Sequence, residues 1–335
     1  MTGLQQNQLA KSAAEISKGE LGVLSLSEAD VIGLLDLRAL LDGLAEGFKA
    51  LSSGNVQAPA RPAITIPGKG FSLTMPAWMD GMNIMVKVVN VFEGNLAIDL
   101  PNHLALVTLF DPATGAPVCV MDGTYITGIR TAASAVLSVR ELARKDATIA
   151  TIVGAGVQGR EHLRLLPLVR DFDEIRIASL YPEDAERLAR HHPRARAVTD
   201  LEAAVRSSDV VCLASHSYQP VVESRWVRPG THVSSVGYAP PMGEMPVDLV
   251  RQAALCIETR DAFKAPPVGC AELAGLDPEA GIELGELLLG RKPGRVSDSQ
   301  ITVYKAMGVA MEDMVAAHLV YEKAKARGTG HRLTF

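Results

Sequence analysis

The segment that most constrains this chain is an apolar run over residues 147–153 that leads into three glycines and then into a helical pattern. Gly154, Gly156 and Gly159 have the GxGxxG spacing. In such a motif the first glycine suits a tight turn, the second lets the backbone approach a pyrophosphate, and the third allows close packing of helix on strand. Because a strand pattern precedes the glycines and a helix pattern follows them, we predict a nicotinamide dinucleotide site. A glycine-rich turn without a ligand is the alternative.

Length and composition indicate a globular protein of two domains. The chain has 335 residues, and a domain commonly takes about 150. Hydrophobic residues make up 47% of the chain and charged residues 21%, which is ordinary for a protein with packed cores. The formal net charge is −5, and no dense run of lysine or arginine is present, so we do not expect nucleic acid as a partner.

The cysteines and the apolar residues bear on the location of the protein. Its four cysteines are scattered without a CxxC pair, so we expect neither a disulfide framework nor a metal site. No apolar stretch reaches the roughly 20 residues that span a bilayer. We therefore expect a cytoplasmic protein with no membrane partner, in which residues 1–20 form a loosely ordered extension.

The first part of the chain reads as a helix followed by a sheet. Residues 25–30 have the pattern of a capped helix start, and residues 31–51 carry leucines and alanines at helical spacing. Residues 63–109 form short runs rich in Val, Ile, Thr and Phe that are broken by turn pairs, which predicts a mainly antiparallel sheet. The cluster at residues 111–117 predicts a turn between two strands.

The second part alternates between strand and helix patterns. A strong helix is predicted over residues 130–143, just before the glycine motif. Beyond the motif we predict strands at 174–178, 195–198, 210–214 and 232–236, and helices at 183–191 and 201–206. Such alternation implies right-handed crossovers and a doubly wound parallel sheet. Residues 301–326 read as a helix that returns to the first domain.

Three cationic residues are candidates for holding a small anionic substrate. Lys87 lies in an apolar strand pattern, where an ammonium is costly to bury unless an anion compensates it. The alternative is that Lys87 points to water from a half-buried strand. Arg130 begins a helix and has the geometry for a bidentate carboxylate contact, or it is an ordinary surface arginine. Arg61 precedes Pro62 in an extended segment and is unremarkable by itself.

Trp78 and three histidines have functional or ordinary interpretations. His216 follows a predicted strand end, where doubly wound sheets bind ligands, so we expect it near the cofactor. Trp78 lines the substrate pocket or is a core aromatic. His162 and His232 lack metal-ligand spacing and are predicted to have packing or surface roles.

Six segments share a pattern with a known family: Arg61, Met75–Ala77, Val86–Asn90, Gly128–Ala133, Gly154–Gly159 and Ile301–Asp313. Together they resemble the ornithine cyclodeaminase and mu-crystallin family, from about residue 22 to the end. The resemblance implies a homodimer formed through the first domain. It also implies an α/β fold: a Rossmann-type doubly wound parallel sheet at 128–307, and a mixed α+β substrate-binding and dimerisation domain at 21–127 and 308–335.

The resemblance also assigns roles to residues. Family members bind the carboxylate of an amino or imino acid with an arginine pair and a lysine, which here become Arg61, Arg130 and Lys87. Lys87 is the implied catalytic residue, which polarises the substrate carboxylate or relays a proton. The substrate site is completed by Met75, Trp78 and Tyr238. The expected cofactor ligands are Arg130, Thr131, Gly154, Gly156, Val157, Gln158, Ser179, Ser215, His216 and Gly237.

Two departures from the family pattern bear on the reaction. Cyclodeaminases of the family carry an aspartate after a late Rossmann strand, where this chain has Tyr238 at or beside that position. A phenol that titrates near 10 is a poor general base at neutral pH. Ornithine-acting members also place an acid before the Met-Pro pair, where residues 72–74 are neutral. Ornithine is therefore disfavoured as the substrate.

These observations predict NAD(P)H-dependent reduction of an imine or ketimine carboxylate to an amino acid, or the reverse dehydrogenation. The imine is cyclic or is formed from a 2-oxo acid and an amine. One alternative is an ornithine or lysine cyclodeaminase in which Glu244 or Asp248 replaces the missing aspartate. Another is a non-enzymatic ligand binder of the mu-crystallin type.

The choice between NAD and NADP depends on the end of the second Rossmann strand. An acid there holds the ribose 2′-hydroxyl of NAD, and an arginine suits the 2′-phosphate of NADP. This chain has Ser179 at the expected position of the acid and Leu180 where many relatives carry arginine. The sequence leaves both cofactors open, and we favour NAD because no compensating cation is nearby.

Overall fold

The computed structural model describes residues 22–237, 241–266 and 268–334. The predicted extension at residues 1–20 and Tyr238 lie outside these residues. The chain forms two compact units. Of the described residues, the first unit takes those in 22–40, 55–127 and 309–334, and the second takes those in 41–54 and 128–308. Residues 41–54, which fall within the predicted first domain, therefore belong to the second unit.

The first unit is built on a mixed sheet with the strand order β16-β1-β7-β6-β5-β4-β2, and β3 also pairs with β4. Neighbouring strands are antiparallel except β1 and β7, which are parallel. The prediction of a mainly antiparallel sheet is therefore confirmed. The strands are β1 (Gly22–Leu26), β2 (Val56–Gln57), β3 (Ala63–Ile66), β4 (Gly70–Met79), β5 (Ile84–Val91), β6 (His103–Phe110), β7 (Pro117–Asp122) and β16 (His331–Thr334).

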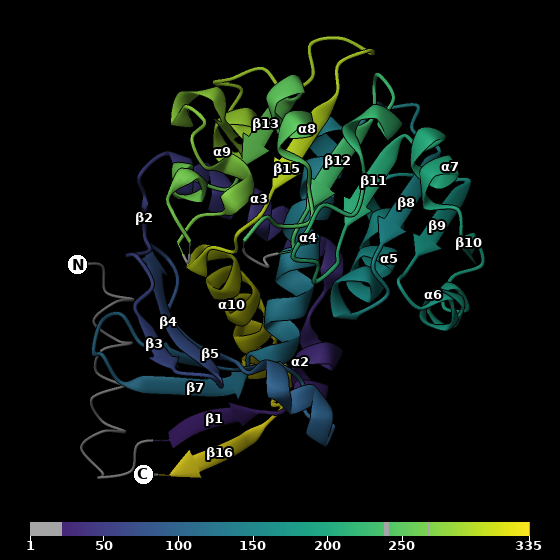
Figure 1. Cartoon of the computed structure of the whole chain (residues 1–335). Coiled ribbons are helices and arrows are strands. Elements are labelled where there is room, and N and C mark those ends of the chain that lie inside the picture. Colours follow the sequence, from purple (N-terminus) through teal and green to yellow (C-terminus); the bar gives the residue numbers. More distant parts are fainter. Residues whose placement is uncertain (1–21, 238–240, 267, 335) are drawn as a thin grey trace. The chain divides into compact units, whose positions relative to one another are not determined.

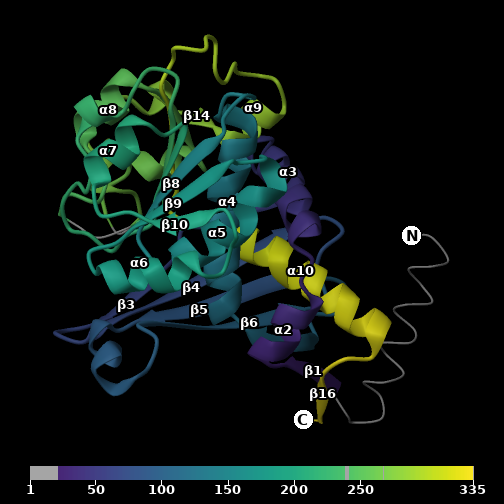
Figure 2. The ribbon, with the colours of Figure 1, turned by 90° about the vertical axis from the view of Figure 1, so that its right-hand side faces the viewer.

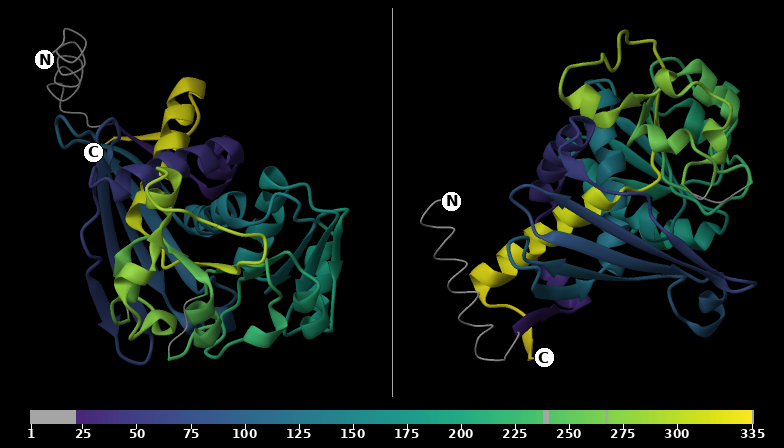
Figure 3. Two further views of the ribbon diagram at one scale, coloured as in Figure 1. Left: turned by 90° about the horizontal axis from the view of Figure 1, so that it is seen from above. Right: turned by 90° about the vertical axis from the view of Figure 1, so that its left-hand side faces the viewer.

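Side chains alternate between the two faces of this sheet, as the pleat requires. Helix α10 (Ala310–Arg327) packs against β4 and β5 (Figure 2; Figure 3, right). The inward-facing residues of the central strands are buried and include Leu73, Met75, Met85, Lys87, Val89, Val107 and Leu109. On the other face, large apolar side chains of β3, β5 and β6 are exposed, namely Ile64, Ile66, Val88, Leu104 and Leu106.

The single helix predicted over residues 31–51 is wrong, because the structure has two helices there. Helix α2 (Glu28–Leu34) starts at a capping box formed by Ser27 and Asp30. Helix α3 (Leu37–Ser52) begins anew after Asp36, whose carboxylate accepts the backbone N–H groups of residues 38 and 39. Asp36 therefore interrupts the leucine pattern by capping a second helix.

The second unit is a parallel sheet with the strand order β10-β9-β8-β11-β12-β15-β13-β14, in which every pair is parallel (Figure 1). The strands are β8 (Ile149–Val153), β9 (Glu174–Ala178), β10 (Ala195–Ala197), β11 (Val210–Leu213), β12 (His232–Ser235), β13 (Ala254–Ile257), β14 (Ile282–Glu283) and β15 (Thr302–Lys305). The order reverses between β8 and β11, which confirms a doubly wound Rossmann-type fold.

Helix α4 (Thr124–Leu142) precedes β8. The α-helices between the later strands are α5 (Val157–Val169), α6 (Pro182–Ala189), α7 (Leu201–Arg206), α8 (Val247–Gln252) and α9 (Leu284–Leu288). The core between them is formed by buried residues such as Val153, Val211, Leu213, Val233 and Val303. None of the helices in the described residues combines the length and the apolar character needed to cross a bilayer.

The helix predicted over residues 301–326 is wrong at its start. Thr302–Lys305 is strand β15, which lies between β12 and β13 and is buried on both faces. A strand of this kind lacks the alternation that marks a half-buried strand. Gly308, with φ of +77°, ends this segment, and helix α10 begins at Ala310.

Candidate functional site

The glycine motif has the local geometry that its spacing predicts. Gly154 follows β8 with φ of +121°, and a Cβ atom there would lie 2.3 Å from the carbonyl oxygen of Ala214. A Cβ atom on Gly159 would lie 2.0 Å from the oxygen of Gly154. Gly156 is the N-cap of α5, and a Cβ atom there would meet nothing within 4 Å. The turn is therefore closely packed at two glycines and open at the third, where a pyrophosphate would approach the N–H groups of α5.

The other residues predicted around this motif lie at the same end of the second unit. Val157 opens α5 and is 55% exposed, and Gln158 donates its side-chain N–H to the carbonyl of Gly128 at 3.2 Å. Ser179 directly follows β9, and the next residue, Leu180, is 85% exposed. The carboxyl ends of β8 and β9 therefore present small or exposed side chains.

A buried carboxylate joins the ends of β11 and β12. Glu244 accepts hydrogen bonds from Ser215 N (2.7 Å), Ser215 Oγ (2.7 Å), Ser235 Oγ (2.9 Å) and Gly237 N (2.6 Å). These four donors fill the lone-pair positions of a carboxylate. Glu244 therefore has no acceptor position left with which to act as a general base, the role that the cyclodeaminase alternative gives it. Asp248 is exposed on α8.

Lys305, the last residue of β15, is a buried cation beside this carboxylate. Its Nζ lies 2.8 Å from Glu272 Oε1 and donates to the carbonyl of Gly237 at 2.7 Å and to Ser235 Oγ at 3.1 Å. Sequence reasoning missed this residue, although a lysine close to the apolar residues Val303 and Met307 was a signal. His216 is exposed, and its ring lies edge-on to that of Tyr218.

Arg130 lies on α4 and is only 5% exposed, so it is not an ordinary surface arginine. A Cβ atom on Gly308 would lie 2.7 Å from its Nη1, so the guanidinium packs directly against the glycine backbone. Glu258 Oε2 accepts the N–H groups of Met307 and Gly308, both at 2.8 Å. The turn against which Arg130 packs is therefore fixed by a buried carboxylate. Thr131 follows Arg130 on α4 and is half-buried.

In the first unit, Lys87 forms a fully buried ion pair. Its Nζ lies 2.7 Å from Asp313 Oδ2, and neither side chain has exposed surface. A second, longer contact of 3.4 Å joins Nζ to Thr127 Oγ1. The alternative that Lys87 points to water is therefore wrong. Asp313 on α10 was not identified from the sequence as its partner.

The remaining predicted substrate residues lie on β4 or beside it. Met75 is buried and is the register partner of Lys87, so the two lie on the same face of the sheet. Trp78 occupies a strand position that alternates to the other face, so the structure does not bring it to Lys87. The carbonyl of Pro62 accepts the N–H of Thr74, which places the neighbouring Arg61 beside β4.

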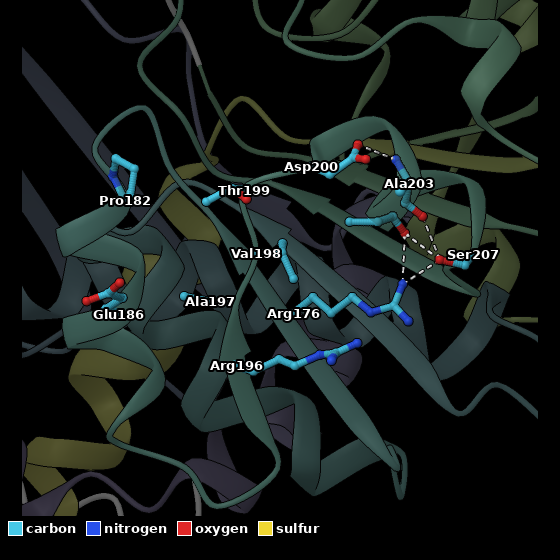
Figure 4. Close-up of a pocket in the computed structure, with 11 residues that line it drawn as sticks. Arg176, Pro182, Glu186, Arg196, Ala197, Val198, Thr199, Asp200, Ala203 and Ser207 are labelled. Carbon is cyan, nitrogen blue, oxygen red and sulfur yellow. Dashed lines mark hydrogen bonds between the residues drawn. The ribbon is translucent and has the colours of Figure 1, made fainter.

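A surface pocket of about 440 Å³ lies elsewhere on the second unit (Figure 4). It is lined by residues of β9, β10, α6 and α7, and it includes none of the predicted cofactor or substrate residues. Arg176, which lines it, is held by Ser207 Oγ at 2.5 Å and by the carbonyl of Ala204 at 3.3 Å. Because this arginine serves to link β9 to α7, the pocket gives no indication of a ligand.

The model of the ornithine cyclodeaminase/mu-crystallin family matches residues 23–328. The chain belongs to this family. A ketimine reductase mu-crystallin of Mus musculus is 34% identical over 286 residues, which are 84% of this chain and 90% of that protein. The ornithine cyclodeaminase/mu-crystallin resemblance seen in the sequence is therefore confirmed.

Two solved structures of high similarity extend the comparison. The Δ1-pyrroline-2-carboxylate reductase of Thermococcus litoralis, in complex with NADH and L-proline, is 32% identical, with a TM-score of 0.86, over 93% of this chain and 100% of that one. An archaeal alanine dehydrogenase dimer with bound NAD is 28% identical, with a TM-score of 0.85, over 94% of this chain and 99% of that one. Both matches cover nearly the whole of each chain, as expected for members of one family with one fold.

Proposed function

We propose that this member of the family reduces the C=N bond of an imino acid carboxylate to an amino acid with NADH or NADPH, or catalyses the reverse dehydrogenation. The observation that carries the proposal is the similarity, over most of each chain, to a ketimine reductase and to a Δ1-pyrroline-2-carboxylate reductase solved with NADH and L-proline. A reduced nicotinamide, when bound, supplies the hydride that such a reduction needs.

The second unit holds the cofactor in this proposal. The open backbone at Gly156 and the N–H groups at the start of α5 receive the pyrophosphate. The proposed ligands of the dinucleotide are Arg130, Thr131, Gly154, Val157, Gln158, Ser179, Ser215, His216 and Gly237. We favour NAD over NADP, because the position after Ser179 is occupied by exposed Leu180 rather than by an arginine.

The first unit supplies two of the proposed substrate residues, Lys87 as the catalytic residue and Arg61 as a carboxylate anchor. Arg130, the other proposed anchor, belongs to the second unit. Asp313 compensates the charge of Lys87, which lets the ammonium stay buried on the sheet face that it shares with Met75. An ammonium so placed is a proton donor for the imine nitrogen, and reduction then completes when hydride reaches the adjacent carbon.

A cyclodeaminase is the less supported reading of the same family membership. The substitute bases proposed for it were Glu244 and Asp248. Glu244 already accepts four hydrogen bonds, and Asp248 is exposed on α8. A proton-transfer role for either residue therefore has no support in the described part of the chain.

We also propose a homodimer formed through the outer face of the sheet in the first unit. Ile64, Ile66, Val88, Leu104 and Leu106 are 36–67% exposed on β3, β5 and β6. Large exposed apolar patches of this kind mark interaction sites, and the archaeal alanine dehydrogenase is a dimer. A cytoplasmic location is part of the proposal and accords with four buried cysteines that form no disulfide.

Oxidation of NADH and NADPH tests the proposed reaction. Glyoxylate, pyruvate and oxaloacetate are each combined with ammonia or methylamine, and preformed cyclic ketimine carboxylates are assayed beside them. We expect oxidation that requires both the oxo acid and the amine, or the ketimine alone. If no combination oxidises either cofactor, the proposal fails. Ammonia release from ornithine or lysine without net cofactor reduction would instead establish a cyclodeaminase, and cofactor binding without turnover would indicate a ligand binder.

A further inference from the structure

Glu244 is a buried carboxylate at the end of the second unit where strands β11 and β12 finish. Its side chain accepts two backbone N–H groups, from Ser215 and Gly237, and two hydroxyl groups, from Ser215 and Ser235. The residue is only 1% exposed. Its own carbonyl also accepts the N–H of Val221 at 2.9 Å, so the backbone at this position is anchored as well.

Glu244 lies just beyond the carboxyl ends of β11 and β12, where its contacts join the two strands. Leu213 and Ser235 are register partners at the ends of β11 and β12, and the last ladder bond joins Val236 N to the carbonyl of Leu213 at 3.2 Å. Beyond that bond, the Glu244 carboxylate bridges the two strand extensions through Ser215 and Gly237. Ligands of doubly wound sheets bind outside the carboxyl ends of the strands. Glu244 thus determines the spacing of the backbone at the edge where the proposed cofactor binds.

Gly237 is held on both sides of its backbone. Its N–H donates to Glu244, and its carbonyl accepts from Lys305 Nζ at 2.7 Å. A Cβ atom at this position would lie 2.5 Å both from Glu244 Cδ and from the carbonyl oxygen of Ser215. Glu272 compensates the charge of Lys305 at 2.8 Å. The residue that ends this strand extension therefore has little freedom to move.

The chemistry of the partners requires a carboxylate rather than another polar group. All four partners donate hydrogen bonds to Glu244, and an ionised carboxylate only accepts. A glutamine of the same size would turn an N–H group toward one of the donors and leave that donor without an acceptor. The negative charge and its two oxygens are thus matched to this edge of the sheet.

We propose that Glu244 is a positioning residue for the dinucleotide, which acts by fixing the backbone of Ser215 and Gly237 for cofactor binding. This inference rests on the proposed cofactor. Glu244 touches neither cofactor nor substrate in this account. Its loss is expected to weaken cofactor binding more than it impairs use of the substrate at saturating cofactor.

The test compares E244Q with E161Q in the full chain. Glu161 is a matched control, because it is also 1% exposed in the second unit, but its oxygens form ion pairs with Arg160 and Arg164 on its own helix. NADH affinity is measured by fluorescence titration, and hydrogen–deuterium exchange reports the amides of Ser215 and Gly237. We expect E244Q to raise the Kd for NADH by about tenfold or more and to lose protection at whichever of the two amides faces the introduced N–H group. The KM for the imine at saturating NADH should stay within about threefold, and E161Q should resemble the parent.

Several outcomes would overturn the inference. One is NADH affinity in E244Q within about twofold of the parent, and another is an equal loss of affinity in E161Q. A parent chain that binds neither NADH nor NADPH would overturn the proposed cofactor as well, which separates the two failures. If E244Q does not fold, E244D, which keeps the charge but has a shorter reach, carries the same test with the same expected direction. Unchanged NADH affinity in E244D would then contradict the inference.

Discussion

Replacing Lys87 with methionine removes the cation of an ion pair that has no exposed surface and an N–O distance of 2.7 Å. At an effective dielectric constant of about 20, two unit charges at that distance attract each other by about 6 kcal/mol. The desolvation of both groups offsets much of this attraction. Removing one partner of a buried pair nevertheless costs about 3–5 kcal/mol, because the remaining buried charge loses the compensation that this partner gave. We therefore expect K87M to lower the free energy of unfolding by that amount.

A double-mutant cycle with D313N separates the stability effect from the catalytic effect. The K87M/D313N variant removes both charges of this pair, so we expect it to recover most of the stability lost in K87M while remaining inactive in imine reduction. Urea denaturation measures stability, and cofactor oxidation measures activity. K325M is the surface control, because Lys325 lies on α10 like Asp313 and its pair with Glu322 is about half exposed. We expect K325M to lower the free energy of unfolding by less than about 1 kcal/mol.

Three results of the cycle would refute this reasoning. A loss below about 1 kcal/mol in K87M would show that the pair is not desolvated as described. Additive losses in the double variant would show that Lys87 and Asp313 are not coupled. Full imine reduction by K87M/D313N would show that Lys87 is not catalytic, even if the stability results agreed.

The glycine turn, the buried histidines and the exposed sheet face each give a further prediction. G154A should abolish NADH binding, because a Cβ atom would lie 2.3 Å from the oxygen of Ala214 at φ of +121°; NADH titration that matches the parent would contradict this. Burial lowers the pKa of His162 to about 4 and that of His232 to about 3. Both imidazoles are neutral in the folded protein, whereas in the unfolded chain their pKa is 6.5. Their contribution to the free energy of unfolding is therefore complete above pH 6.5 and is lost as the pH falls toward the lowered pKa values. Urea denaturation should show that each histidine lowers the free energy of unfolding by about 2 kcal/mol at pH 5 relative to pH 7. The same pH dependence in H232Q as in the parent would contradict the role given to His232. L106K should shift the protein from dimer to monomer in sedimentation, because Leu106 is 52% exposed on the proposed dimer face; a monomeric parent would refute the dimer.

Local patterns in the sequence were sufficient to predict much of the second unit. The helix predicted at residues 201–206 and the strand at 174–178 have the bounds observed for α7 and β9. The glycine turn was also predicted, because its conformational demands fall on glycines that lie close together in the chain. Such features depend on neighbouring residues, which a sequence displays directly.

The features that were missed depend on residues far apart in the chain. Strand β15 lies between β12 and β13 in the sheet and all its residues are buried, so they lack the alternation of a half-buried strand. Asp313 was not identified as the partner of Lys87, because only the folded sheet and α10 bring them together. Glu244 was considered as a substitute base, whereas its four donors show that it holds the ends of two strands. Polar residues inside apolar runs indicated that buried charges were present, but the sequence did not show which residues would be their partners.

Transfer of deuterium from cofactor to product tests the central claim most directly. The protein is supplied with NADH deuterated at the hydride position and with a cyclic ketimine carboxylate, and the amino acid product is examined by mass spectrometry and NMR. The account predicts one deuterium on the carbon that bears both the nitrogen and the carboxylate. A product without deuterium at that carbon, formed by the protein at the same rate, would contradict it.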